Sequence, residues 1–274
     1  MSESAQVSVI IPCYHCSNTI GRALASVVAQ TLKPAEVILV DDCSKDATLA
    51  MLYRLQTEYG QDWVKVIPSP VNAGPGTARN IGWAAATQPY IAFLDADDAW
   101  HPQKIEIQYG WMIKHPEVAL TGHACQQWAK TNSGAPSYSV NDDSAFTRVS
   151  KNTLLLSNRF STRSVMLQRA IEQRFVEGKR YCEDYQLWLE MGFAGLACYR
   201  SDLPLAYLFK ASYGESGLSA SLWKMQKGEL EAYRHIYKLK EISLLQLMGL
   251  YLWSNAKYAK RVAVSTVGNA LKAS

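Results

Sequence analysis

The stretch VSVIIPCYHCSNTIGRALASVVAQTLKPAEVILVDD, residues 7–42, decides the fold of this chain. A β-branched apolar run opens it, and a second such run, residues 36–40, stands near its end. Between them, Ile20, Leu24, Val27 and Val28 recur at the spacing of one helix face. A strand, a helix and a second strand in this order predict a βαβ unit, in which the two strands lie parallel.

The same alternation continues through the first half of the chain. Residues 64–67 and 90–94 are further strand-like apolar runs. A helix with the stripe Leu49, Leu52 and Leu55 precedes the first of them, and a Gly/Ala-rich helix, residues 75–86, precedes the second. The pattern predicts an α/β fold with a mostly parallel central sheet flanked by helices.

The second half of the chain is less regular. We expect helices over residues 103–115 and 184–191, strands over 118–124, 164–168, 196–199 and 205–209, and a mobile polar loop over 130–144. Beyond residue 219 the pattern is helical to the end. The sequence therefore predicts an α/β domain, residues 1–218, and a helical C-terminal tail, residues 219–274.

Size and charge narrow the class of protein. With 274 residues, 48% of them hydrophobic, the chain can bury one large core plus a small appendage. The formal net charge of +4 is modest and no dense Lys/Arg run occurs, which argues against a nucleic-acid partner. From Trp223 to the end, nine Lys/Arg face three Asp/Glu, so the tail carries about +6 and the rest of the chain about −2.

No targeting or membrane-spanning segment is expected. The N-terminus lacks the basic region and apolar core of a signal peptide, so we expect a cytoplasmic protein with reduced cysteines. The longest nearly uninterrupted apolar run, residues 242–253, is shorter than the roughly 20 residues that cross a bilayer. Cys13 and Cys16 have the spacing of a redox pair or of half a zinc site, but no second pair of ligands follows.

Acidic side chains stand where predicted strands end. Pro12-Cys13-Tyr14 follows the first strand, Asp41-Asp42 the second, and Asp95-Ala96-Asp97-Asp98 the fourth. The carboxyl ends of parallel strands share one edge of the sheet, so five acids and an aromatic ring should converge there. A divalent cation would relieve their repulsion, and Asp95 and Asp97 offer hard oxygen ligands to Mg²⁺ or Mn²⁺.

Two other interpretations of these acids stay open. Asp95, Asp97 and Asp98 could form a solvated loop that caps the helix after Pro102. Asp42 could be a turn residue before Ser44 and Asp46, either of which could cap the next helix.

A glycine-rich loop leads into the helix over residues 75–86. It reads Asn72-Ala73-Gly74-Pro75-Gly76, and Arg79 lies in the first turn of the helix that follows. Backbone N–H groups and a cation at a helix start suit a phosphate or ribose neighbour, although such glycines also serve close helix packing.

Five blocks in this order resemble a family. VSVIIPCY, VDDCSKD, NAGPGTARNIG, FLDADD and CEDYQLWL are similar to those of bacterial, non-processive family 2 glycosyltransferases with the GT-A fold, over about residues 7–210. The resemblance implies a uridine-type nucleotide-sugar donor, Mn²⁺ or Mg²⁺ held by Asp97 with Asp95, stacking of Tyr14 on the base and a hydrogen bond between Asp42 and the base edge. The donor-binding residues that it implies are Pro12, Tyr14, Asp42, Gly76, Arg79, Asp95 and Ala96.

The resemblance also implies a catalytic base. Asp184 of the later Glu183-Asp184 pair is our choice, with Glu183 and Asp98 on the acceptor side. An inverting transfer needs a carboxylate that deprotonates the acceptor hydroxyl opposite the leaving diphosphate. The alternative is a pair of acids that stabilises a helix start through its dipole.

Two features of other family members are missing here, and their absence narrows the range of expected activities. Processive synthases of this family carry a Q-x-x-R-W block and several membrane spans, and the chain has neither, which favours addition of a single sugar. Residues 207–221 resemble the family's loop with closing serines but lack a histidine that supplies an extra metal ligand in some members, so the metal should be weakly held.

The expected product is a cell-surface glycan or a lipid-linked saccharide of the bacterial envelope, such as a polysaccharide or lipopolysaccharide, made on the cytosolic face of the membrane. A sugar-nucleotide nucleotidyltransferase would need a Gly-rich, Arg-bearing loop after the first strand, which residues 12–16 do not form, and a dinucleotide oxidoreductase would need G-x-G-x-x-G there. A catalytically silent nucleotide-sugar-binding module is the third alternative.

The tail admits two interpretations. Leu244, Leu247, Met248 and Tyr251 form an apolar stripe near Lys257, Lys260 and Arg261. This composition is typical of a peripheral anchor on anionic lipid. It equally suits a helix that covers the α/β domain or a second subunit of a homo-oligomer.

Overall fold

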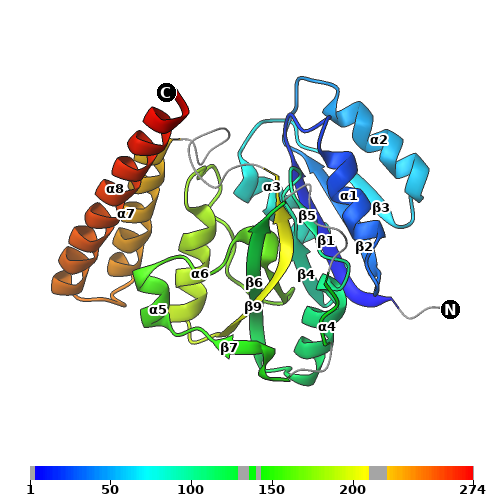
Figure 1. Ribbon diagram of the computed structural model, residues 1–274. Helices are drawn as coiled ribbons and strands as arrows, with labels where there is room; N and C mark the ends of the chain where they lie inside the picture. Colours follow the sequence, from blue (N-terminus) through cyan, green and yellow to red (C-terminus); the bar gives the residue numbers. More distant parts are fainter. Residues whose placement is uncertain (1–3, 129–135, 140–142, 210–220, 274) are drawn as a thin grey trace.

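A mixed sheet of nine strands forms the centre of the protein, which a computed structural model describes over residues 4–128, 136–139, 143–209 and 221–273. Most of the predicted polar loop 130–144 and of the serine segment 207–221 lies outside these residues. The strands follow the order β3-β2-β1-β4-β8-β6-β9-β5, with β7 paired to β9 (Figure 1). They are β1 (Ala5–Cys13), β2 (Pro34–Asp41), β3 (Val64–Pro68), β4 (Tyr90–Phe93), β5 (Ala99–Trp100), β6 (Val118–Gln127), β7 (Phe146–Arg148), β8 (Met166–Gln168) and β9 (Ala197–Leu208).

The predicted parallel sheet is confirmed for the first four strands. β3, β2, β1 and β4 pair in parallel, and β6 and β9 form a further parallel pair. β8 is antiparallel to both β4 and β6, which joins the two parallel groups into one sheet. The carboxyl ends of β1, β2, β4, β6 and β9 therefore lie at the same edge of the sheet, and we call it the carboxyl edge.

The helices of the described chain lie close to the predicted ranges, except for α5, which was not predicted. They are α1 (Ile20–Val28), α2 (Thr48–Tyr59), α3 (Pro75–Ala85), α4 (Lys104–Lys114), α5 (Lys151–Leu156), α6 (Glu183–Phe193), α7 (Leu222–Lys238) and α8 (Leu244–Ala273), with short 3-10 turns at Asp143–Ala145 and Thr162–Ser164. The prediction of two strands over residues 196–209 is wrong, because β9 is continuous there. Asp202 and Pro204 suggest a break in the sequence, but a bulge opposite His123 and Ala124 takes up the extra residues.

The two faces of the sheet bury separate cores. Alternate residues of β1 point to opposite faces, so Val9 and Ile11 pack beneath α1 and α4 while Ile10 packs against α3. Residues of α6, α7 and α8 continue the core on the Ile10 face. These three helices lie side by side at one end of the molecule (Figure 1).

One glycine lets α3 approach the sheet. A Cβ atom at Gly82 would lie 2.5 Å from Cγ2 of Ile10, whereas a Cβ atom at Gly110 of α4 would meet nothing within 4 Å. We expect Gly82→Ala to lower the free energy of unfolding by about 2 kcal/mol through overpacking. Gly110→Ala, its control, should raise that free energy by about 0.5 kcal/mol, because alanine favours a helix. Urea unfolding monitored by circular dichroism measures both, and equal effects would contradict the packing argument.

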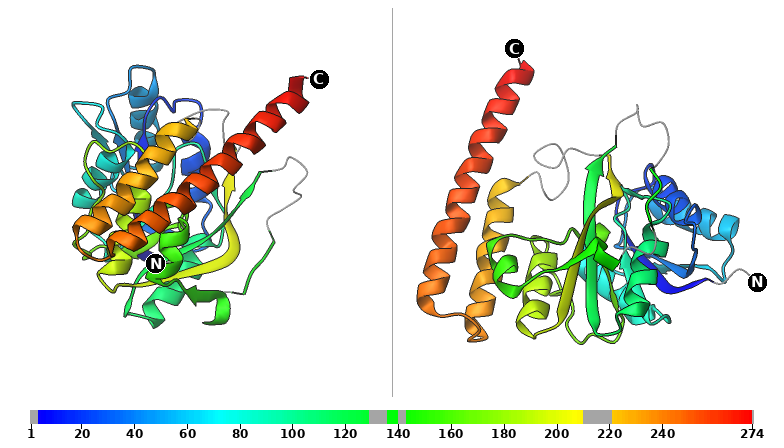
Figure 2. Two further views of the ribbon diagram at one scale, coloured as in Figure 1. Left: turned by 90° about the vertical axis from the view of Figure 1, so that its left-hand side faces the viewer. Right: turned by 60° about the horizontal axis from the view of Figure 1, so that its bottom comes forward.

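The C-terminal tail is an antiparallel helix pair. Glu229 of α7 pairs with Lys257 and Arg261 of α8, and the Gln226 side chain bonds Ser254. α7 packs against α6, whereas α8 is the outermost helix (Figure 2). The inner face of the tail thus covers the α/β domain, as one of the two interpretations expects. No helix in the described part of the chain is long and apolar enough to cross a membrane.

Candidate active site

The acidic loops converge at the carboxyl edge as predicted. Asp42 follows β2, and Asp95 to Asp98 follow β4, with β1 between these two strands. The backbone N–H of Asp42 donates to the Cys13 carbonyl at 2.8 Å, which joins the ends of β1 and β2.

Asp42 fixes the glycine-rich loop in place. Its buried carboxylate accepts hydrogen bonds from the backbone N–H groups of Ala73 at 2.9 Å and Gly74 at 2.8 Å. Gly74 has φ of 92°, a left-handed conformation that favours glycine. Asp46 accepts a hydrogen bond from the backbone N–H of Thr48 at the start of α2, as the alternative interpretation allows for Asp46, whereas the Asp42 side chain anchors the glycine-rich loop. The predicted bond between Asp42 and a base edge stays a prediction.

Tyr14 is half-exposed beyond the end of β1. Its ring stacks on that of His15, with centroids 4.1 Å apart and planes 14° apart. His15 covers one face of the Tyr14 ring, so a nucleotide base that stacks on Tyr14 would use the opposite face. This stacking role stays a prediction. Pro12 pairs with Val40 in the sheet one position before Cys13.

Arg79 joins the two acidic blocks. Its guanidinium is buried, with Nη2 2.8 Å from Oδ1 of Asp95 and Nη1 3.0 Å from Oε1 of Glu183. A Cβ atom at Gly76 would lie 3.0 Å from Cγ of Glu183, so the glycine leaves the room that Glu183 occupies. Gly76 therefore acts in packing here, and the single arginine of α3 brings a loop after β4 together with the start of α6.

A second arginine, which carries no motif signal in the sequence, completes this arrangement. Arg163 Nη2 lies 3.3 Å from Oδ2 of Asp95, and its Nη1 pairs with Asp98. The indole N–H of Trp100 donates to the Arg163 carbonyl at 2.8 Å. Because Asp98 is buried against Arg163, we expect it to affect an acceptor by orienting that arginine.

Asp184 is held by neutral donors. Its carboxylate accepts from the backbone N–H of Tyr185 at 2.7 Å and from the side chains of Asn158 and Thr162 at 3.2 Å each. Neither Asn158 nor Thr162 was predicted as a site residue, because they lie before β8, whose antiparallel insertion the sequence pattern does not reveal. Glu183, by contrast, is paired to an arginine.

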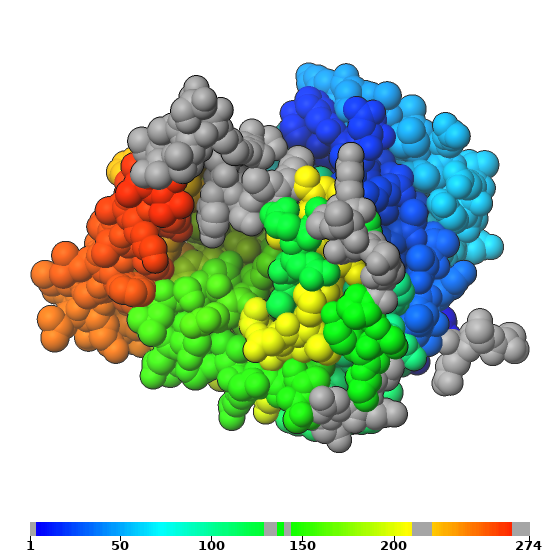
Figure 3. Space-filling model, in the orientation of Figure 1, coloured from blue at the N-terminus to red at the C-terminus, as the bar shows by residue number. Residues whose placement is uncertain are grey.

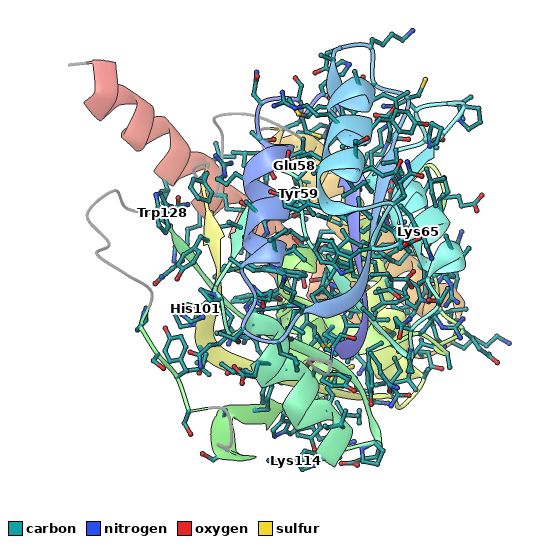
Figure 4. All side chains as sticks on the ribbon, turned by 90° about the vertical axis from the view of Figure 1, so that its right-hand side faces the viewer. Glu58, Tyr59, Lys65, His101, Lys114 and Trp128 are labelled. Atoms are coloured by element: carbon teal, nitrogen blue, oxygen red, sulfur yellow. The ribbon has the colours of Figure 1, made fainter. Side chains whose placement is uncertain are left out.

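Arg22 links the backbone of the loop Asp95 to Asp98 to the residue that follows β9. The main-chain carbonyl of Asp97 accepts a hydrogen bond of 2.6 Å from Arg22 Nη2. The Arg22 guanidinium lies 3.7 Å from the ring centroid of Phe209, which stacks on Trp128 (labelled in Figure 4). Ala96, between the two acids, is buried. The position of Asp97 thus depends on contacts from α1 and β9 as well as from its own loop.

We call Asp95, Asp97, Asp98, Glu183 and Asp184, with Arg79 and Arg163, the acidic site. Burial and the neighbouring carboxylate Asp184 raise the pKa of Glu183 to about 7. Burial, with Asp95 and Asp97 nearby, raises the pKa of Asp98 to about 7, although Arg163 opposes this. For Asp95, the charges of Arg163 and Arg79 outweigh burial and lower the pKa. When ionised, the five carboxylates outnumber the two arginines, which leaves an excess of negative charge.

The raised pKa of Glu183 predicts that the stability of the protein depends on pH. A carboxyl group with a raised pKa binds its proton more tightly in the folded state, so its stabilisation is full below the unfolded value of about 4.5 and is lost as the pH rises toward 7. The melting temperature of the wild-type protein should therefore fall between about pH 5 and pH 8. In Glu183→Gln the fall should be smaller by roughly 3 °C, as measured by differential scanning calorimetry. Parallel curves would contradict the raised pKa.

The residues present fit a divalent cation. Mg²⁺ and Mn²⁺ take carboxylate oxygens, and one or two protein carboxylates suffice when phosphates and water complete the shell. The excess negative charge is the feature that a cation would neutralise. Within the described residues no group of three or more His, Cys, Asp or Glu side chains could hold a metal alone, so a zinc site at Cys13 and Cys16 gains no support.

The capping alternative for the acid loop fails. α4 begins after Gln103, and no side chain caps it. Asp95 and Asp98 pair with arginines instead. The acids are therefore organised toward the carboxyl edge.

Fold and site together define a GT-A type transferase domain, with acids at the carboxyl edge of a largely parallel sheet. The chain belongs to glycosyl transferase family 2, and the sequence profile of that family matches residues 8–175. It is thus an enzyme that transfers sugar, and the predicted family and fold are confirmed.

Relatives differ in how much of the chain they share. The chain is 30% identical over 185 residues to UDP-Glc:alpha-D-GlcNAc-diphosphoundecaprenol beta-1,3-glucosyltransferase WfgD of Escherichia coli, covering 68% of this chain and 69% of that protein. It is 29% identical over 260 residues to TuaG of Bacillus subtilis (strain 168), named for teichuronic acid biosynthesis, covering 93% and 94%. To a glycosyltransferase of Nostoc sp. it is 44% identical over 101 residues, which span 37% of this chain and only 31% of that protein.

A solved structure shares the fold. The mannosyltransferase PcManGT of Pyrobaculum calidifontis, in complex with GDP-Man and Mn²⁺, has a TM-score of 0.63 at 16% identity. The likeness covers 100% of this chain and 82% of that one, so it extends through the tail.

Proposed function

We propose that this protein is an inverting, metal-dependent transferase that adds one sugar from a nucleoside diphosphate donor to an acceptor hydroxyl. The observation that carries the proposal is the Arg79 bridge between Asp95 and Glu183. It brings the acid loop after β4, the proposed diphosphate side, beside the start of α6, where the proposed base lies.

Asp184 serves as the general base in this proposal. It accepts the proton of the acceptor hydroxyl while the hydroxyl oxygen forms a bond to the anomeric carbon. The bond from that carbon to the diphosphate breaks on the opposite face, and the nucleoside diphosphate leaves with the electron pair. Burial raises the pKa of Asp184, so its carboxylate has the capacity to accept a proton, and three neutral donors orient it.

Asp97 and Asp95 would hold the divalent cation. When bound, Mn²⁺ or Mg²⁺ supplies neutralisation of the charge that grows on the leaving diphosphate. Arg79 and Arg163 keep Asp95 ionised for this purpose, since their charges lower its pKa. The Mn²⁺ in the complex of the Pyrobaculum calidifontis mannosyltransferase supports the choice of metal.

The substrate classes follow from relatives. The E. coli enzyme is named for a UDP-glucose donor and a diphosphoundecaprenol-linked acceptor, and TuaG for teichuronic acid. We therefore propose a uridine diphosphate sugar as donor and a lipid-linked or cell-surface saccharide as acceptor, at the cytosolic face of a membrane. The family match removes the support for a nucleotidyltransferase, which leaves a silent binding module as the alternative.

A thermal-shift screen of nucleotide sugars with and without Mn²⁺ tests the proposal. A ligand at a hundredfold its Kd stabilises the folded state by about 2.7 kcal/mol, so a uridine diphosphate sugar with Mn²⁺ should raise the melting temperature clearly. Release of the nucleoside diphosphate, measured in the same samples, separates an enzyme from a silent module. Absence of any shift with every nucleoside diphosphate sugar would contradict the proposed donor site.

A further inference from the structure

The outer face of α8 is an exposed apolar surface. Leu244, Leu245, Met248, Leu252 and Trp253 recur at helical spacing, with exposed fractions of 57%, 80%, 57%, 74% and 48%. We call these five residues the α8 apolar face. The opposite side of the helix is buried against the rest of the protein through Leu247, Leu250 and Ser254. The helix therefore has one face that covers the domain and another that faces solvent.

An apolar groove opens beside this face. Its volume is about 310 Å³, and it lies between α5 and α8. Trp253 belongs both to the α8 apolar face and to the groove wall, and its indole N–H donates to the Leu156 carbonyl at 2.9 Å. The lining residues are Asn152, Leu155, Leu156, Gln246, Gly249, Leu250 and Trp253. Leu156 is itself half exposed, so the apolar surface extends from α8 onto the end of α5.

Positive charge flanks the apolar face at both ends. Lys238 and Lys240 precede it and Lys260 follows it, whereas Lys257 and Arg261 pair with Glu229 on the inner side of α8. Glu241 is the single acid between residues 238 and 264. α8 itself, residues 244–273, contains four Lys/Arg and no Asp/Glu. Lys240 and Lys260 are exposed. A second copy of α8 would bring no carboxylates to meet these cations, whereas an anionic lipid surface would offer phosphate groups.

The position of α8 leaves this face accessible. α7 begins beyond β9, whose carboxyl end lies at the carboxyl edge, and α8 runs antiparallel to α7 back toward that edge. α8 forms the outermost flank of the molecule, drawn in orange and red in Figure 3. A flat surface can therefore meet the exposed residues at the start of α8, Leu244 to Trp253.

We propose that the α8 apolar face docks on an anionic lipid bilayer. Leucine, methionine and tryptophan side chains enter the boundary between headgroups and acyl chains, and the groove beside α5 receives part of an acyl chain. Lys240 and Lys260 contact anionic headgroups. Lipid binding of this kind does not depend on the proposed transfer reaction.

Vesicle flotation of the full chain tests the proposal. Vesicles of phosphatidylcholine alone are compared with vesicles of equal parts phosphatidylcholine and phosphatidylglycerol, at low salt. We expect the wild-type protein to float with the mixed vesicles and about tenfold less with the neutral ones. Equal flotation with both kinds of vesicle, or with neither, would overturn the proposal.

Two sets of variants locate the contact. Leu245→Ser/Met248→Ser/Leu252→Ser should lower the affinity for mixed vesicles by about tenfold or more, whereas Val71→Ser/Ile113→Ser/Val176→Ser, at exposed sites on other elements, should leave it unchanged. Lys240→Gln/Lys260→Gln should weaken binding, whereas the exposed pair Lys33→Gln/Lys45→Gln should not. Wild-type affinity of Leu245→Ser/Met248→Ser/Leu252→Ser for mixed vesicles would overturn the assignment of the contact to α8.

Sedimentation without lipid decides between a bilayer and a second copy. A monomer, unchanged by the three serine substitutions, is expected. A dimer that these substitutions dissociate would show that a second copy covers the face and would overturn the proposal. The replaced apolar side chains are exposed, so we expect all variants to fold. Melting curves of the variants check this.

Discussion

Asp184→Asn should lower kcat by about three orders of magnitude, since general-base catalysis contributes on that scale. Asparagine keeps the shape of the side chain and an oxygen that can accept from Thr162, but it cannot take the acceptor proton. The affinity for a uridine diphosphate sugar, measured by calorimetry, should stay within about twofold, because the proposed base contacts the acceptor and not the donor.

A control on the same helix separates this loss from a general effect of neutralising a carboxylate. Glu190→Gln removes a carboxylate of α6 that pairs with His235, away from the acidic site. We expect near wild-type turnover from it. A turnover of Asp184→Asn within tenfold of wild type, or an equal loss of donor affinity and turnover, would exclude Asp184 as the base.

Asp97→Ala should remove the metal dependence of transfer. We expect kcat/KM to fall by about two orders of magnitude or more at every Mn²⁺ concentration, because stabilisation of the charge on the leaving group lowers the barrier of such reactions strongly. Stabilisation of the protein by a uridine diphosphate sugar should no longer increase when Mn²⁺ is added. Steady-state kinetics over a Mn²⁺ titration and parallel melting curves measure both effects.

The matched control for this substitution is Asp62→Ala, at an exposed turn before β3, which should leave both readouts unchanged. Loss of activity in Asp97→Ala with a retained response to Mn²⁺ would place the metal elsewhere. Removal of the Asp97 charge should also lower the pKa of Asp98, because that charge contributes to its rise.

The sequence predicts those parts of the fold that depend on local periodicity. The βαβ alternation is visible in residues 7–42, and parallel strands share one edge, so the convergence of Asp42 with Asp95 to Asp98 could be foreseen. The pair Glu183 and Asp184 was found by resemblance. The contact of Glu183 with Arg79, in the block NAGPGTARNIG, spans 104 positions and depends on tertiary packing.

The residues that the sequence does not reveal reach the site from the segment before β8. Arg163, Asn158 and Thr162 carry no periodic or motif signal, and their position follows from the antiparallel insertion of β8 between β4 and β6. The continuity of β9 was missed for a similar reason, because a bulge hides the alternation on which strand prediction depends. The positive charge of Arg163, in a polar segment before β8, is the one signal that could have suggested it as a partner of the acids Asp95 to Asp98.

The most direct test of the account is a crystal structure of the protein with uridine diphosphate and Mn²⁺, with the metal located by its anomalous scattering. We expect Mn²⁺ to contact the Asp97 carboxylate and the diphosphate at the carboxyl edge, with the Asp184 carboxylate facing the position of the sugar from the acceptor side. A metal bound away from Asp97, or an Asp184 that faces away from the diphosphate, would contradict the account.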